Sequence, residues 1–91
     1  MRVNRDIERA SLDEALAMFQ QEFSRRYPES QFLIDGEGYE DEDLDLNIYV
    51  DGDEVEIGKY AAEVSARVQQ QTGYFILPFI LPSESYPLGA A

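Results

Sequence analysis

The segment DLDLNIYV, residues 43–50, constrains the fold of this chain more than any other stretch. Polar and apolar side chains alternate through it, and in a β-strand alternate side chains point to opposite faces of the sheet. The pattern therefore predicts a strand with one face buried against a second layer of structure. The apolar face would carry Leu44, Leu46, Ile48 and Val50, and the other face Asp43, Asp45, Asn47 and Tyr49.

The residues before this strand predict a helix. SLDE, residues 11–14, has the form of a capping box, in which Ser11 and Glu14 exchange hydrogen bonds between side chain and backbone. The apolar residues that follow recur at the three- and four-residue spacing of one helical stripe. Pro28 disfavours helical backbone at the residue before it, so we expect the helix to end near Tyr27.

A second helix is expected after the strand. Asp53 can cap its first turn, and Gly73 stands where a left-handed C-cap glycine is common. Gly58 lies inside this span and costs about 1 kcal/mol relative to alanine in a helix. Two alternatives therefore stay open: a helix that starts nearer Gly58, and an extra hairpin at residues 51–57.

Two further segments complete the expected sheet. QFLID, residues 31–35, is β-prone and ends at a glycine, and YFILPFIL, residues 74–81, is almost wholly apolar. Pro78 cannot donate to a sheet ladder, so it limits the last strand to an edge or a bulge. The order of elements predicts an α+β fold: a two-layer α-β-β-α-β sandwich, in which two helices cover one face of a three-stranded sheet. We expect the last strand beside the first, in the order 2-1-3.

The length and composition indicate one small domain without catalytic machinery. We expect residues 1–82 to form a single α+β domain and residues 83–91 to be a short flexible C-terminal tail. The chain has no cysteine and no histidine, which removes common metal ligands and the commonest general base. Its serines have no base partner, so we expect neither enzymatic activity nor a cofactor.

The charge is distributed unevenly along the chain. The formal net charge is −12, and residues 28–91 carry all of it because Lys59 and Arg67 are their only basic residues. Such a surface repels nucleic acid and anionic lipid, which bind proteins through lysine and arginine. The longest apolar stretch, residues 74–81, is far shorter than the ~20 residues that cross a bilayer. We expect a cytoplasmic protein that binds neither nucleic acid nor membrane.

The carboxylates near residue 43 raise the question of a metal site. Asp43 and Asp45 match ligand positions of an EF-hand calcium loop, but Ile48 stands where the sharp turn of that loop requires glycine. Strand alternation would also point these oxygens along a pleat and not around an ion. We expect no dedicated metal site, with Asp43 and Asp45 as weak candidates for divalent binding.

The same residues carry a likeness to a known family. A helix, a short strand, a glycine-containing loop and a strand that opens with Asp43-Leu44-Asp45 resemble nucleotidyltransferases, in which paired carboxylates hold two ions. Glu37 follows Gly36 where that family has serine, and the last strand offers no third carboxylate. The likeness implies an inactive relic that binds a divalent metal weakly.

The acidic residues between positions 35 and 54 suggest an alternative function. They would gather around one hairpin and present carboxylates to a basic groove as nucleic acid presents phosphates. The chain would then be an inhibitor or regulator that docks on a basic protein. Their ordinary role would be a solvated loop that keeps a sheet edge from aggregating.

The last strand leads to the function that we favour from sequence. Both of its alternating sets are apolar, and only one can meet the helices. The other would form an exposed apolar surface, which usually marks an interface. Alternatively, Tyr86 and Leu88 fold back over this surface, or Pro78 bends the strand. We expect a small acidic, non-enzymatic protein-interaction domain, a homodimer, that binds through Leu33, Tyr49, Phe75, Leu77 and Phe79.

Overall fold

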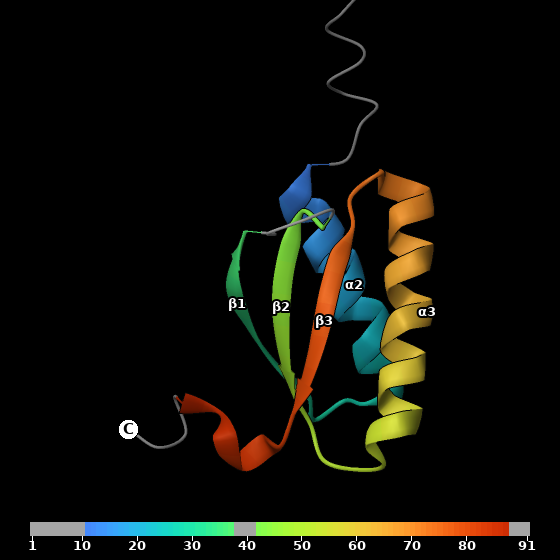
Figure 1. Cartoon of the computed structure of the whole chain (residues 1–91). Helices are drawn as coiled ribbons and strands as arrows, with labels where there is room; N and C mark the ends of the chain where they lie inside the picture. Colours follow the sequence, from blue (N-terminus) through green and yellow to red (C-terminus); the bar gives the residue numbers. More distant parts are fainter. Residues whose placement is uncertain (1–10, 38–41, 88–91) are drawn as a thin grey trace, which may run out of the picture.

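The computed structural model describes residues 11–37 and 42–87, which form two layers (Figure 1). The predicted α+β sandwich with two helices on one face of the sheet is confirmed. Among the described residues, no helix has both the length and the apolar character needed to span a membrane. In chain order the elements are α2 (Leu12–Arg26), β1 (Gln31–Glu37), β2 (Leu44–Tyr49), α3 (Glu54–Thr72), β3 (Ile76–Leu81) and a short 3-10 helix, η1 (Ser83–Ser85).

Helix α2 begins and ends where the sequence predicts. The Ser11 hydroxyl accepts a hydrogen bond from the amide of Glu14, and the Glu14 carboxylate accepts one from the amide of Ser11, both at 3.1 Å. The predicted capping box is therefore present. At the other end, the amide of Tyr27 donates to the carbonyl of Phe23 (3.0 Å), and Pro28 follows at once.

Helix α3 is capped by Asp53, and this settles the alternatives for its start. One carboxylate oxygen of Asp53 accepts from the amides of Val55 (2.9 Å) and Glu56 (3.2 Å). The helix runs through Gly58 without interruption, and residues 51–57 form no extra hairpin. Gly73 ends it in the left-handed conformation (φ 85°), which glycine adopts at little cost.

We expect Asp53→Ala to lower the free energy of unfolding by about 1 kcal/mol, because two amides of the first turn lose their acceptor. For a domain of this size the melting temperature would fall by roughly 4–8 °C, measurable by circular dichroism. Asp53→Asn is the matched control, since it removes the charge but keeps a capping oxygen. Equal melting temperatures for the alanine variant and the wild type would show that the cap does not stabilise the domain.

Strand β2 lies at the centre of the sheet, and this corrects the predicted strand order. β1 pairs with β2 in antiparallel fashion and β3 pairs with β2 in parallel fashion, so the order is β1-β2-β3 and the prediction 2-1-3 is wrong. The burial of the strands agrees with this order. Nearly every residue of β2 is buried, as a strand covered by two neighbours requires, whereas β1 exposes Ile34 and Asp35 and suits an edge.

Strand β3 forms the other edge, as Pro78 predicts. The carbonyls of Phe75 and Leu81 accept from the amides of Asp43 (2.7 Å) and Val50 (2.9 Å). Successive residues of a strand point their backbone groups to opposite edges, so Pro78 points away from β2. Its missing amide therefore falls on the outer edge, where no strand among residues 11–37 and 42–87 needs a donor. The register of β2 with β3 runs without a shift past Pro78.

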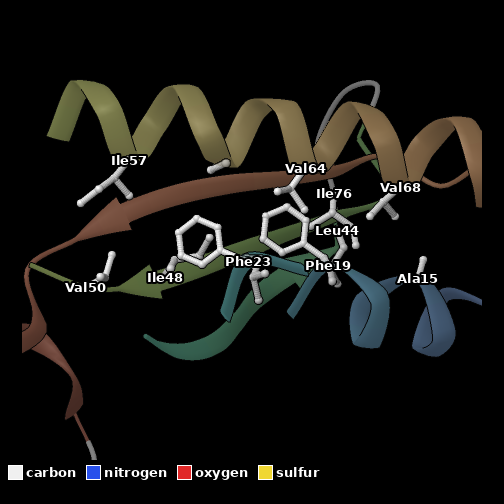
Figure 2. Packing of buried hydrophobic residues seen from close by; sticks show 12 residues of the cluster. Ala15, Phe19, Phe23, Leu44, Ile48, Val50, Ile57, Val64, Val68 and Ile76 are labelled. Atoms are coloured by element: carbon white, nitrogen blue, oxygen red, sulfur yellow. The ribbon is translucent and has the colours of Figure 1, made fainter. Parts of the chain in front are cut away.

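The core lies between the two layers. Figure 2 shows the rings of Phe19 and Phe23, both fully buried, between α3 and the strands. The Phe23 ring also meets the rings of Tyr27, Phe32 and Tyr60 at centroid distances of 5.1–6.1 Å, so it joins both helices to β1. The other core residues are Ala15, Leu44, Leu46, Ile48, Val50, Ile57, Ala61, Val64, Val68 and Ile76.

Candidate functional site on the open face of the sheet

The face of the sheet that turns away from the helices is called the open face here. Because Leu44, Leu46 and Ile48 point into the core, alternation places the intervening residues of β2 on this face. The register of the three strands then defines three rows across it: Gly36, Asp45 and Leu77; Leu33, Asn47 and Phe79; and Gln31, Tyr49 and Leu81. Apolar side chains therefore border Asn47 on both sides in the second row, and Leu77 borders Asp45 on one side in the first.

The five residues predicted to form an interface do not have equal exposure. Phe79 is 41% exposed, and Leu33, Phe75 and Leu77 are partly exposed. Leu33 and Phe79 flank Asn47 in one row, and Leu77 lies beside Asp45 in the next. Tyr49 is only 5% exposed and therefore adds little to the exposed apolar surface.

Tyr49 is covered by the segment that follows β3. The ring of Tyr86 packs against it with a centroid distance of 5.2 Å, in an edge-to-face arrangement. Ser83 anchors this segment, because its amide (3.0 Å) and its hydroxyl (2.6 Å) both donate to the carboxylate of Asp51. Residues 83–86, which the sequence assigns to the tail, thus fold back over one end of the open face. Leu88 lies outside the described residues.

The two weak metal candidates lie in different environments. Asp43 is exposed, and its carboxylate accepts from the amide of Phe75 (2.8 Å), so it holds the start of β3 against the start of β2. Asp45 is 3% exposed in the middle of the sheet. Across residues 11–37 and 42–87, no three acidic, cysteine or histidine side chains are grouped so that they could hold a metal ion.

Asp45 is the unusual residue of the open face. Its Oδ1 atom is buried and has no hydrogen-bond partner within the described part of the chain. Burial raises the pKa of its carboxyl above the ordinary value of 3.8, and a hydrogen bond with Glu42 and the negative charges of Glu42 and Asp35 raise it further. Strand alternation predicted the face on which Asp45 lies but not its burial. The sequence signal for this burial was the apolar character of both faces of β3, because side chains of an edge strand cover those of the central strand beside it.

We expect Asp45→Asn to raise the melting temperature at pH 7 by a few degrees. The carboxyl group of Asp45 has a higher pKa in the folded state than in the unfolded state, so its protonation stabilises the fold. This contribution to the free energy of unfolding is complete below pH 3.8 and is lost as the pH rises through the elevated pKa. The gain from the substitution should therefore shrink as the pH falls toward 3.8. Thermal melts of the wild type and the Asp45→Asn variant at several pH values would measure this difference in melting temperature.

Asp51→Asn is the matched control, because the opposite sign is expected. The hydrogen bonds from the hydroxyl and then the amide of Ser83 lower the pKa of Asp51. Its contribution is therefore present above pH 3.8 and is lost as pH falls through the lowered pKa. Asp51→Asn should lower the melting temperature at pH 7. If both variants shifted the melting temperature in the same direction, the assigned environments would be incorrect.

The fold and this site define a class: a small two-layer α+β domain with a partly apolar open sheet face and a buried carboxylate within it. No protein-family model, curated protein or solved structure matches the chain.

Proposed function

We propose that this chain is a non-enzymatic protein-interaction domain whose binding surface is the open face of the sheet. The observation that carries this proposal is the exposure of Phe79 (41%) in one row with Leu33 and beside Leu77. An aromatic side chain is a common energetic centre of protein interfaces. Partly exposed apolar neighbours around it can exclude water from such a contact.

Three hydroxyl groups of the described chain take part in structural hydrogen bonds, which supports a role without catalysis. The Ser65 hydroxyl donates to the carbonyl of Ile76 (2.6 Å), and the Thr72 hydroxyl donates to the carbonyl of Val68 (2.8 Å). The Ser83 hydroxyl donates to Asp51, but the sequence contains no histidine to act as the base between them. Each of these groups holds secondary structure in place.

The alternative role, docking of acidic residues on a basic protein, receives less support. Asp51 and Asp53 lie beyond one end of β2, whereas Asp43 precedes its other end, about 20 Å away for a strand of this length. Asp43, Asp51 and Asp53 also accept structural hydrogen bonds. Glu40 and Asp41 lie outside the described residues. Docking through this hairpin and homodimerisation through the open face both stay predictions.

The proposed function is tested by selecting binding peptides from a random twelve-residue phage library and comparing two variants. Phe79→Asp places a charge on the open face, and Val55→Asp places the same charge on α3, where Val55 is 72% exposed. Selected peptides should bind the wild type and the Val55 variant alike, and should bind the Phe79 variant at least about tenfold more weakly. Sedimentation equilibrium of the same three proteins tests self-association.

The outcomes separate the possible uses of the surface. A wild-type dimer that Phe79→Asp dissociates would identify a second copy as the partner, which is one form of the proposed function. Peptides that bind the Phe79 variant as tightly as the wild type, in a protein that is also monomeric, would contradict the proposal. Amide NMR spectra of each variant confirm that it is folded.

A further inference from the structure

The open face holds the buried carboxyl group of Asp45, and the charged residues that act on it within the described chain are acidic. Asp45 is buried, and the charged residues near it are Glu42, which precedes β2, and Asp35 from β1, both of them acidic. Strand β3 contributes no charged residue to this face. The basic residues of the described chain are all in the helices on the other side of the sheet: Arg25 and Arg26 in α2, and Lys59 and Arg67 in α3.

A buried carboxylate without a cation lowers the stability of the folded state. An asparagine at position 45 would keep a polar side chain there without the charge. The open face nevertheless places an acid beside Leu77 and one row from Leu33 and Phe79. Groups that cost stability in the free protein are often found where a ligand compensates them.

We propose that the open face binds a polypeptide segment that presents one arginine or lysine to the carboxyl pair of Asp45 and Glu42, with apolar side chains resting on Leu77, Phe79 and Leu33. This inference rests on the proposed function and specifies the partner. The cation reaches the pair through Glu42, which is partly exposed, because Oδ1 of Asp45 is buried. The apolar surroundings strengthen the ion pair once the partner excludes water.

The charges favour a different protein over a second copy as the partner. A symmetric dimer through this face would bring the same surface of both copies together, and with it two sets of Asp45, Glu42 and Asp35. Each copy also carries a net charge of −12. A basic partner instead gains from the field of the whole domain during association.

The test uses two synthetic peptides, TLTRTLT and the same sequence with citrulline in place of arginine. In an extended peptide the two leucines and the arginine lie on one face, and citrulline has the shape of arginine without its charge. Binding is followed by amide NMR titration at about 0.15 M salt, where distant charges are screened. We expect the arginine peptide to shift the signals of Asp45, Leu77 and Phe79 and to bind about tenfold or more tighter than the citrulline peptide.

Three variants test which charge of the protein is responsible for the tighter binding of the arginine peptide. Glu42→Gln should bring the arginine peptide close to the affinity of the citrulline peptide, and Asp45→Asn, which keeps the Glu42 carboxylate, should weaken binding of the arginine peptide by a smaller factor. Amide spectra should show a folded domain for both variants. Glu63→Gln, which removes the same charge from the exposed surface of α3, should leave the affinity unchanged. An equal loss in all three variants would mean attraction to the overall negative charge and would overturn the inference.

Failure of this inference is distinguishable from failure of the proposed function. If both peptides bind the open face with equal affinity and both depend on Phe79, the face is an interaction surface without a preference for a cation. If the wild type is a dimer that Phe79→Asp dissociates, a second copy is the partner. Both results overturn the inference and leave the proposed function standing. Absence of binding by either peptide at millimolar concentration also overturns it, and the phage selection then decides the proposed function independently.

Discussion

Phe23→Ala is expected to lower the free energy of unfolding by about 3–5 kcal/mol, the range for removing a buried phenylalanine. The side chain is fully buried, and its ring meets those of Phe19, Tyr27, Phe32 and Tyr60. These contacts come from α2, β1 and α3, so no single element can move to fill the cavity. A domain of this length has a total stability of roughly 5–14 kcal/mol, so the loss is a large fraction of it.

Urea unfolding followed by circular dichroism measures this loss. With a slope near the lower end of the usual ~1–3 kcal/mol per molar range, the midpoint should fall by about 2–3 M. Phe79→Ala is the matched control, because it removes the same atoms from a side chain that is 41% exposed. Its midpoint should fall much less. Similar losses for both variants would contradict the central place of Phe23 in the core.

Ser65→Ala is expected to cost about 1–3 kcal/mol, a large effect for the loss of one oxygen atom. The Ser65 hydroxyl is buried and donates to the carbonyl of Ile76 at 2.6 Å. Ile76, like Pro78, points its backbone groups to the outer edge of β3, where no strand of the described chain pairs with it. Alanine would leave this carbonyl covered by α3 and without a donor.

Ser24→Ala provides the comparison for this variant. Ser24 is also in a helix, and within the described chain no hydrogen bond of its side chain is seen, so alanine there should be neutral or slightly stabilising. Chemical denaturation of the two variants and the wild type gives the difference. A Ser65 variant as stable as the Ser24 variant would show that the hydrogen bond to β3 contributes nothing net.

Local signals in the sequence were sufficient for most element boundaries. The capping box at Ser11, the cap at Asp53 and the glycine at position 73 each act within a few residues of the chain, and each is found where it was predicted. Pro78 predicted an edge strand for the same reason, since the loss of one amide is a property of the residue itself. Alternation along a strand is also local, and the strand register places Leu33, Tyr49, Leu77 and Phe79 in rows on the open face. Their role as an interface stays a prediction.

The strand order and the environment of two residues on the open face could not be predicted in this way. Tyr49 is covered by Tyr86, which lies far along the chain and is placed by the bonds between Ser83 and Asp51. Asp45 is buried because β2 occupies the centre of the sheet and not an edge. Both outcomes depend on which strands are neighbours.

The sequence by itself determined the helices, the strands, their caps and the faces of β2, because these depend on backbone preferences and on periods of two and 3.6 residues. Only the tertiary structure decided that β3 joins β2, that the segment after it covers Tyr49, and that Asp45 keeps its carboxylate among apolar and acidic neighbours. The physical reason is that burial and electrostatic environment are sums over residues distant in the chain. A local pattern can orient a side chain, but the residues that surround it are set by the packing of the whole domain.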